Sequence, residues 1–224
     1  RERELMLAGV SHDLRTPLTR LRLSLELMSS DDELTDDMIR DVEDMNAILD
    51  QFLAFVRDGS DEPVETTDLG ELIREVVAPY NQQQETVRLC VEPMPPFALR
   101  RVSVKRLLVN LIENALRYGG GGVEVAAYVS GDQHAPYVVL SVLDRGPGID
   151  PAELEGIFNP FIRGDRARGG QGAGLGLAIV KRIASQHGGI VELRNREGGG
   201  LEARVSLPLG LLLPRDAVQG KPAE

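Results

Sequence analysis

Hydrophobic residues recur with helical spacing in two stretches near the start of the chain. The first stretch repeats every seven positions, with a second apolar position inside each repeat: Leu7, Leu14, Leu18, Leu21, Leu25 and Met28. The second stretch alternates steps of four and three: Met38, Val42, Met45, Leu49, Phe52 and Val56. Such repeats are typical of helices that pack into bundles. With the polar break at 30–35 and Thr35 as a helix cap, they predict a helical hairpin over residues 1–57.

A hairpin of this length cannot bury both apolar stripes by itself. Pairing with a second copy would cover the stripes in a four-helix bundle, so the pattern predicts a homodimer. Turn-forming and charged residues over 58–64 then predict a linker to a second domain.

The apolar pattern after the linker mixes helical and strand periods. Asp68, with Glu71 three residues later, predicts the start of a helix that runs to about Tyr80. Further helices are expected over 103–118 and from Gly174 to about His187, and strands over 87–91, 123–129, 137–143, 190–194 and 201–207. This order favours an α/β sandwich over residues 65–209, followed by a short tail, 210–224, that we expect to be disordered.

The amino-acid composition excludes several classes of function for this chain. The 224 residues carry a formal net charge of -10 and include one cysteine, Cys90. The excess of acid argues against nucleic acid as a partner and against direct membrane contact, and one cysteine cannot form an internal disulfide. No apolar run approaches the roughly 20 residues that span a bilayer. The polar opening enters the helical pattern without a cap, so we expect a piece of a longer protein, with an upstream membrane segment left open.

One histidine stands out in the first helix. The heptad places Ser11 on the seam and His12 beside it, so we expect His12 to face solvent, mostly neutral and with a ring-nitrogen lone pair available. Asp13 is suited to orient the ring or accept its proton. A His-Asp pair on a protein surface commonly has no role beyond solubility. Here, however, Pro17 lies inside the predicted helix, where proline costs about 3 kcal/mol. A helix bend that is needed beside a functional site would explain why proline occurs there.

Two asparagines four residues apart share one face of the helix over 103–118. The amides of Asn110 and Asn114 can therefore point into one site, where an amide oxygen would suffice as a ligand for Mg²⁺ beside nucleotide phosphates. Solvation of the helix is an equally good explanation when this pair is taken alone.

Three glycine-containing segments follow. Asp144 ends a predicted strand, and Gly146 and Gly148 allow a turn or the close approach of a ligand. Phe158 and Phe161 are explained by core packing in the first instance. Arginines, among them Arg163, then occur in a glycine-rich stretch. This stretch could form either a flexible lid that closes over phosphates or a solvated loop. Gly172, Gly174, Leu175, Gly176 and Leu177 lead into a helix, whose amino end can bind an anion.

Together these segments resemble the motifs of bacterial sensor histidine kinases. Residues 11–19 (Ser-His-Asp-Leu-Arg-Thr-Pro-Leu-Thr) resemble the H-box, and 110–118, 144–150, 157–165 and 172–180 resemble the N, G1, F and G2 boxes of the GHKL ATPase fold. The resemblance implies His12 as phosphoacceptor, Asp13 as its activator and Thr16 as the residue that positions water for dephosphorylation. It implies nucleotide contacts by Asn110, Asn114, Arg117, Tyr118, Asp144, Gly146, Gly148, Phe158, Arg163, Gly172, Gly174, Leu175, Gly176 and Leu177.

The same resemblance implies a reaction and its partners. ATP and Mg²⁺ would be the cofactors, with Asn114 as metal ligand and Asp144 as acceptor of the adenine amino group. The phosphoryl group would pass from His12 to an aspartate of a response regulator receiver domain. The chain would be the cytoplasmic portion of a protein held in the bacterial inner membrane. Transfer within one chain and between the two chains of the dimer both stay open, because the choice depends on the handedness of the connection at 30–35.

Two rival functions are compatible with parts of this pattern. An ATPase machine of the chaperone or gyrase kind usually has a glutamate as general base at the position of Asn110, and an amide cannot deprotonate water, which disfavours it. A module that mainly dephosphorylates the regulator is left open by Thr16. Among the other polar positions, we expect His187 to be structural at a helix end, His134 to lie in a turn and Cys90 to lie in the core.

Overall fold

The computed structural model describes residues 18, 19, 21, 23, 38, 39, 42, 45, 46, 49, 61–82, 87–132, 135–154, 156–160, 162 and 174–210. The chain divides into two compact units, one made of residues 1–58 and 159–178 and the other of residues 59–158 and 179–224. No helix among the described residues is long and apolar enough to cross a membrane.

Within the first 58 residues, every described position is helical, in agreement with the predicted hairpin. Val42 and Leu49 are buried in the single chain. Leu21 and Met45, which occupy the predicted seams, remain 45% and 44% exposed. These two seam positions therefore keep apolar surface that one copy of the chain does not cover.

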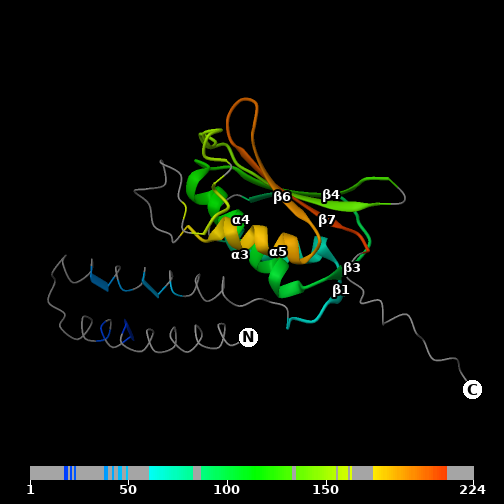
Figure 1. Ribbon diagram of the computed structural model, residues 1–224, viewed down its shortest axis with the longest axis horizontal. Coiled ribbons are helices and arrows are strands. Elements are labelled where there is room, and N and C mark those ends of the chain that lie inside the picture. Colours follow the sequence, from blue (N-terminus) through cyan, green and yellow to red (C-terminus); the bar gives the residue numbers. More distant parts are fainter. Residues whose placement is uncertain are drawn as a thin grey trace, which may run out of the picture. The chain divides into compact units, whose positions relative to one another are not determined.

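The second unit has a layer of helices on one face of a five-stranded sheet (Figure 1). The helices are α3 (Leu69–Gln82), α4 (Arg101–Tyr118) and α5 (Gly176–Gln186), the last of which enters this unit at Ile179. The strands are β2 (Val87–Val91), β4 (Val123–Ser130), β5 (Tyr137–Leu143), β6 (Ile190–Asn195) and β7 (Leu201–Pro208), in the order β2-β4-β5-β7-β6. β2 and β4 are parallel and all other neighbours antiparallel. The predicted α/β sandwich is confirmed.

Two short strands were not predicted. β1 (Glu65–Thr67) and β3 (Phe97–Leu99) pair antiparallel in a separate two-stranded sheet. Each has only three residues, too few for a period of two to show, and β3 directly follows the pair of prolines at 95–96. The pairing fixes the beginning of this unit to the segment that precedes α4.

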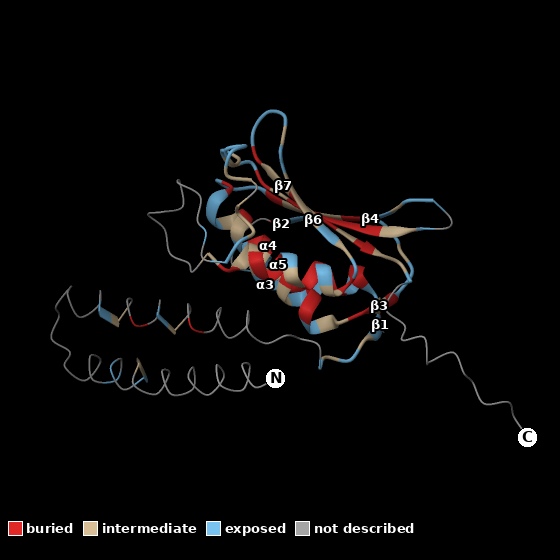
Figure 2. Ribbon diagram, in the orientation of Figure 1, coloured by how far each residue is buried: buried red, intermediate tan, exposed pale blue. Residues whose placement is uncertain are grey.

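Alternate residues of β4 and β7 are buried and face the core between the sheet and the helices, where buried residues lie (Figure 2). Val125, Leu140 and Val205 are fully buried there, and Leu140 lies opposite Val205 on the neighbouring strand. The prediction that Cys90 lies in the core is wrong, because Cys90 is exposed. It lies opposite Ala126, which alternates with the inward residues of β4, so Cys90 faces the side of the sheet that no helix covers.

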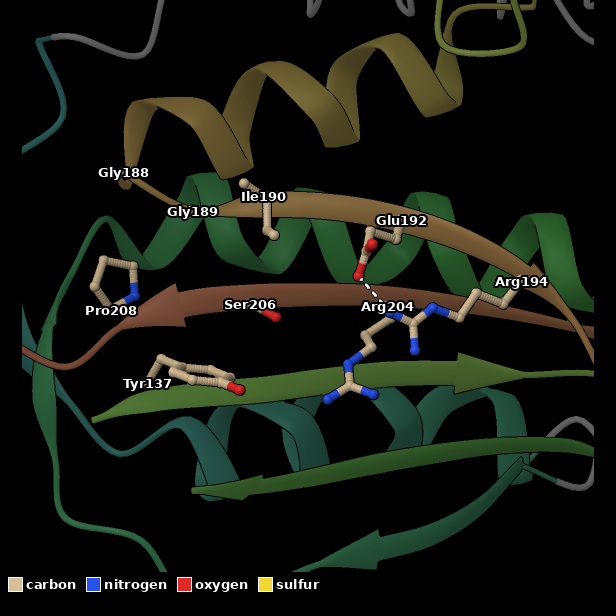
Figure 3. A pocket seen from close by; sticks show the side chains of 9 residues that line it. All are labelled: Tyr137, Gly188, Gly189, Ile190, Glu192, Arg194, Arg204, Ser206 and Pro208. Atoms are coloured by element: carbon tan, nitrogen blue, oxygen red, sulfur yellow. Dashed lines mark hydrogen bonds and ion pairs between the residues drawn. The ribbon is translucent and has the colours of Figure 1, made fainter. Parts of the chain in front are cut away.

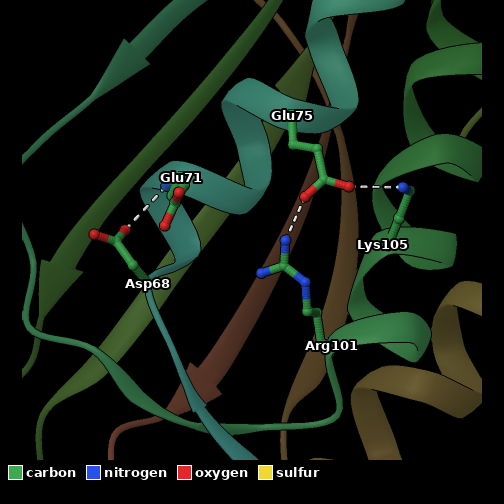
Figure 4. A network of polar contacts seen from close by, with 5 residues as sticks. All are labelled: Asp68, Glu71, Glu75, Arg101 and Lys105. Carbon is green, nitrogen blue, oxygen red and sulfur yellow. Dashed lines mark hydrogen bonds and ion pairs between the residues drawn. The ribbon is translucent and has the colours of Figure 1, made fainter.

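α3 begins as its sequence predicts and is tied to α4 by charge. The Asp68 carboxylate accepts a hydrogen bond from the Glu71 amide at 2.9 Å, which is the N-cap half of a capping box. One turn later, Glu75 forms ion pairs with Arg101 and with Lys105, the latter at 2.8 Å, both in the first turns of α4 (Figure 4).

His187 joins the end of α5 to the start of α4 from a buried position, with 2% of its surface exposed. Its Nδ1 lies 2.8 Å from the Ile183 carbonyl oxygen, and its Nε2 accepts a hydrogen bond from the Arg100 amide at 3.0 Å. A carbonyl only accepts and an amide only donates, so the ring is neutral with its proton on Nδ1. Gly188 follows with φ +67°, the left-handed conformation expected of a helix cap. His187 is therefore structural, but as a neutral bridge rather than as a cation at the helix end.

The free energy of unfolding should depend on pH because His187 is neutral in the folded chain. Burial lowers the pKa of His187 below its ordinary 6.5 and outweighs the hydrogen bond to the Ile183 carbonyl, which raises it. The charge of Arg100 adds a smaller lowering and that of Glu62 a still smaller rise. Just below pH 6.5 the unfolded chain thus binds the proton more readily than the folded chain. Stability should be complete above pH 6.5 and fall as the pH drops toward the lowered pKa, by up to about 1.4 kcal/mol per pH unit.

Urea unfolding at several pH values between 5 and 8 measures this effect. A His187→Gln variant keeps an amide oxygen for the Arg100 amide and does not titrate, so its stability should fall less over the same range. The difference between the two chains removes the contributions of His12 and His134, which both retain. If the unfolding free energies of wild type and His187→Gln changed with pH in the same way, His187 would not gain a proton on unfolding.

Candidate functional site

Asp144 follows the last residue of β5 and is buried, with 6% of its surface exposed. Its Oδ1 accepts two hydrogen bonds from main-chain amides, one from Gly146 at 2.8 Å and one from Leu201 at 3.0 Å. Both bonds use the same oxygen. Oδ2 is therefore the carboxylate oxygen that a ligand with an N–H donor can reach.

The main chain of Asp144 is held as firmly as its side chain. The Asp144 amide donates to the Leu201 carbonyl at 2.9 Å, and Nη1 of Arg196 donates to the Asp144 carbonyl at 2.5 Å. Gly200 has φ +106° and approaches that carbonyl so closely that a side chain there would collide with it. The segment 196–201 thus fixes the direction of the carboxylate.

The end of α4 packs directly on the loop that follows Asp144. A Cβ atom added at Gly146 would lie 2.5 Å from the Tyr118 carbonyl oxygen and 2.9 Å from the Gly119 Cα. A Cβ atom at Gly119 would lie 2.5 Å from the Asp144 Cβ. Only glycine permits this approach, and it brings the last turn of α4 to the end of β5.

The two asparagines of α4, Asn110 and Asn114, precede this contact by about two and one helical turns, and both are half-buried. The Asn110 side-chain nitrogen donates to the Arg106 carbonyl at 2.8 Å, so its amide oxygen is the atom left for a ligand. Among the hydrogen bonds between described residues, none involves the Asn114 side chain. Arg117 and Tyr118 complete the same helix, and Tyr118 is 41% exposed.

Gly148 and Asn195 anchor the loop to β6. Gly148 has φ +72°, and any side chain on it would collide with the Asn195 amide oxygen. That oxygen accepts from the Ile149 amide at 2.9 Å, while the Asn195 nitrogen donates to the Ile149 carbonyl at 2.7 Å. The paired bonds hold the loop after Asp144 in one conformation.

Phe158 lies in the turn segment that follows this loop and is half-buried. The Lys181 ammonium group lies 5.6 Å from the centre of its ring, within the range of a cation–π contact. Core packing was the default explanation for Phe158, yet its exposure leaves part of the ring available.

The segment that leads into α5 has the features of an anion-binding helix start. Gly174 has φ +68°, Leu175 is fully buried and α5 begins at Gly176, so the amides of its first turn have no partner within the helix. Leu175 anchors the turn with its side chain and offers a ligand only its main chain.

Five of the predicted site residues lie outside the described residues: His12, Asp13, Thr16, Arg163 and Gly172. The structure brings the end of α4, at Tyr118, against the segment 144–146. Sequence reasoning missed Gly119, Asn195, Arg196 and Gly200, which support Asp144 and its loop. The glycines at 119–122 and 198–200 were the available signal, but they suggested only breaks between elements.

No group of three or more His, Cys, Asp or Glu side chains suited to a metal occurs within the described ranges. A divalent cation here would therefore depend on ligand phosphates together with an amide oxygen such as that of Asn114. The donor set fits Mg²⁺, which commonly takes only one or two protein oxygens.

A groove lies elsewhere, over β5, β6 and β7 on the sheet face that no helix covers (Figure 3). Its lining includes Tyr137 and Arg204, and Nη2 of Arg194 donates to Glu192 at 2.9 Å. No residue predicted to bind nucleotide lines this groove. The candidate site is thus the junction of α4 with the end of β5.

Family comparisons match both parts of the chain. Residues 2–61 match the His Kinase A (phospho-acceptor) domain, and residues 100–211 match the histidine kinase-, DNA gyrase B- and HSP90-like ATPase family. The second match includes α4, Asp144 and the start of α5.

Similar proteins include the sensor histidine kinase GtrS of Pseudomonas aeruginosa, 41% identical over 216 residues. That alignment covers 94% of this chain and 43% of GtrS. The sensor histidine kinase CpxA of Escherichia coli is 33% identical, over 91% of this chain and 46% of CpxA. The chain thus spans about half the length of these relatives.

Solved structures show the same likeness. The histidine kinase domain of the E. coli osmosensor EnvZ is 35% identical with a TM-score of 0.53, over 74% of this chain and 99% of that domain. Full-length ShkA in complex with AMPPNP is 26% identical with a TM-score of 0.71, over 91% of this chain and 45% of ShkA.

Proposed function

We propose, because this chain belongs to the sensor histidine kinase family, that it binds ATP and transfers the γ-phosphoryl group to His12. The observation that carries the proposal is the presence in one chain of a phosphoacceptor domain at 2–61 and an ATPase domain at 100–211. A protein that only hydrolyses ATP would need the ATPase domain but no phosphoacceptor domain. The phosphoacceptor domain is what supplies a histidine that can be phosphorylated.

The geometry around Asp144 supports adenine nucleotide as the ligand. Its Oδ2 is available to accept a hydrogen bond from the adenine amino group, while Oδ1 is held by two amides. Gly146 and Gly148 let the base approach the main chain, and Tyr118, whose carbonyl meets Gly146, has a partly exposed ring. We assign the half-buried Phe158 to the nucleotide as the family resemblance implies. The carboxylate would thereby select adenine over guanine, which has no amino group at that position.

We assign the phosphates to residues of α4 and, as the family resemblance implies, to the residues that lead into α5. Asn110 and Asn114 present amide oxygens, and Asn114 would hold Mg²⁺, which supplies positive charge to the β- and γ-phosphates. We assign Arg117, Arg163 and the main-chain amides of Gly172, Gly174, Leu175, Gly176 and Leu177 to the phosphate oxygens. These groups neutralise charge as it develops on the leaving ADP.

His12 would act as the nucleophile. A neutral ring nitrogen forms the bond to the γ-phosphorus while the bond from phosphorus to the β,γ-bridging oxygen breaks and ADP leaves. Asp13 orients the ring through its other N–H and accepts the proton that the ring releases. Atoms and charge balance without any further reactant.

We further propose that His12 passes the phosphoryl group to an aspartate on a response regulator receiver domain. Two copies of the chain would form the four-helix bundle, and the exposed seam residues Leu21 and Met45 support this homodimer. ATP and a receiver domain are both found in the cytoplasm, where we place this portion of a protein anchored in the inner membrane.

Transfer to a receiver tests the proposed function. The chain is first labelled with γ-radiolabelled ATP and Mg²⁺ and freed of nucleotide, and a purified receiver domain of the same organism is then added. The label should leave the kinase and appear on the receiver. ATP hydrolysis without any label on protein would contradict the proposal.

Thr16 should affect the removal of phosphate from the receiver domain. We propose that its hydroxyl positions the water that removes phosphate from the receiver, four residues and thus about one helical turn after His12. A Thr16→Ala chain should dephosphorylate the receiver roughly 10-fold or more slowly, in keeping with the loss of a positioned water contact, while its autophosphorylation stays near the wild-type rate. Release of inorganic phosphate from a phosphorylated receiver measures the first rate. Unchanged dephosphorylation would remove Thr16 from the mechanism.

A further inference from the structure

The start of α4 has no cap within its own sequence. The N-cap residue Arg100 makes no side-chain capping bond, and the first turn contains no acidic residue. The first amides of a helix have no partner inside the helix and carry the positive end of its dipole. An acceptor for these amides must therefore come from elsewhere in the chain.

Glu62 supplies that acceptor from 40 residues away. Its Oε1 accepts from the Val102 amide at 2.5 Å, and its Oε2 accepts from the Ser103 amide at 3.0 Å and from the Ser103 hydroxyl at 2.6 Å. Nε of Arg100 donates to the Glu62 carbonyl at 3.2 Å. Four hydrogen bonds, three of them to a charged carboxylate, thus join Glu62 to α4. We call this set the Glu62 clamp.

The clamp lies within the segment predicted to be the linker. That segment covers 58–64, and the β1–β3 pairing begins at Glu65. With the clamp closed, the segment from Glu62 to residue 64 is held on the ATP-binding unit at both ends. The sequence then leaves the four residues 58–61 between the predicted hairpin and the point of attachment.

We propose that Glu62 is a positioning residue that sets the length of the tether between the phosphoacceptor hairpin and the ATP-binding unit. The inference rests on the proposed function, since a tether matters only if the nucleotide must reach His12. Opening the clamp would lengthen the tether from four residues to seven, because the pairing of β1 with β3 stops the release at Glu65.

Tether length acts on the rate through effective concentration. Phosphoryl transfer occurs only in the fraction of molecules in which bound ATP meets His12. For a flexible tether that already spans the distance, effective concentration falls roughly as the −3/2 power of length. A change from four residues to seven should therefore lower the autophosphorylation rate roughly twofold. The affinity for ATP should not change, because the nucleotide contacts lie at the other end of α4.

The release variant is Glu62→Ala combined with Arg100→Ala, which removes all four bonds. Its kcat for autophosphorylation should fall roughly twofold with the KM for ATP unchanged. Glu75→Ala is the matched control, because it also removes a carboxylate that binds the first turns of α4, but from α3 instead of the linker (Figure 4). The control should keep the wild-type kcat.

A second variant leaves the clamp intact and lengthens the tether directly. Inserting Gly-Ser-Gly between Ser60 and Asp61 adds three residues and should lower kcat by the same factor, even if the release variant proves unstable. A wild-type or higher kcat in the insertion variant would overturn the inference. So would a rise in KM in the release variant, or an equal fall in Glu75→Ala. A wild-type chain that does not autophosphorylate would instead overturn the proposed function.

Discussion

A His12→Gln chain incubated with radiolabelled ATP and Mg²⁺ should carry no acid-labile label. Glutamine keeps a polar side chain of similar length but has no lone pair basic enough to attack phosphorus, so the covalent step should be lost entirely rather than slowed. The comparison with wild type is made on denaturing gels before and after acid treatment. This is the largest effect that the account predicts.

The same variant contains its own control. Since His12 belongs to the hairpin and the nucleotide contacts lie in the ATPase domain, His12→Gln should bind an unhydrolysable ATP analogue as tightly as wild type. A His134→Gln chain, altered at the histidine predicted to lie in a turn, should label normally. A label that persists in His12→Gln would place the acceptor on another residue.

Replacing Asp144 by Asn should have the second-largest effect, on nucleotide affinity. Asparagine is isosteric and its oxygen can keep the bonds from the Gly146 and Leu201 amides. Its nitrogen then takes the place of Oδ2 and presents donors to the adenine amino group, which is itself a donor. Losing a charged acceptor in a buried site costs about 1.5–3 kcal/mol, or roughly 10- to 100-fold in Kd.

Isothermal titration with an unhydrolysable adenine nucleotide measures this change, and the guanine analogue measures selectivity. The matched control is Asp150→Asn in the same loop, whose carboxylate accepts a bond from the Ala152 amide at 2.9 Å and is exposed. Asp144→Asn should keep a wild-type melting temperature and lose its preference for adenine. Equal adenine affinities in wild type and Asp144→Asn would show that the carboxylate does not contact the base.

Local patterns predicted the elements that carry the site. The helix over 103–118 and the strands over 123–129 and 137–143 agree with α4, β4 and β5 to within two residues at each end. Their apolar periods are long enough to show in the sequence, and Asp144 could be placed at a strand end from those patterns alone.

The supports of the site could not be predicted in the same way. Arg196 and Asn195 act on residues 46 to 52 positions away, and Glu62 and His187 meet the start of α4 from opposite ends of the domain. Each is a single polar residue with no periodic context, so its partner becomes visible only once the strands and helices are in place. Cys90 shows the converse failure, since a strand pattern does not tell which face of an edge strand is covered.

Mapping of the phosphorylated residue by mass spectrometry tests most directly whether His12 accepts the phosphoryl group. The wild-type chain is incubated with ATP and Mg²⁺, kept at neutral to alkaline pH to preserve phosphohistidine, digested and sequenced by fragmentation. The account predicts one added phosphoryl group, located on His12. ATP consumption with an unmodified His12 peptide, or a phosphoryl group on any other residue, would contradict it.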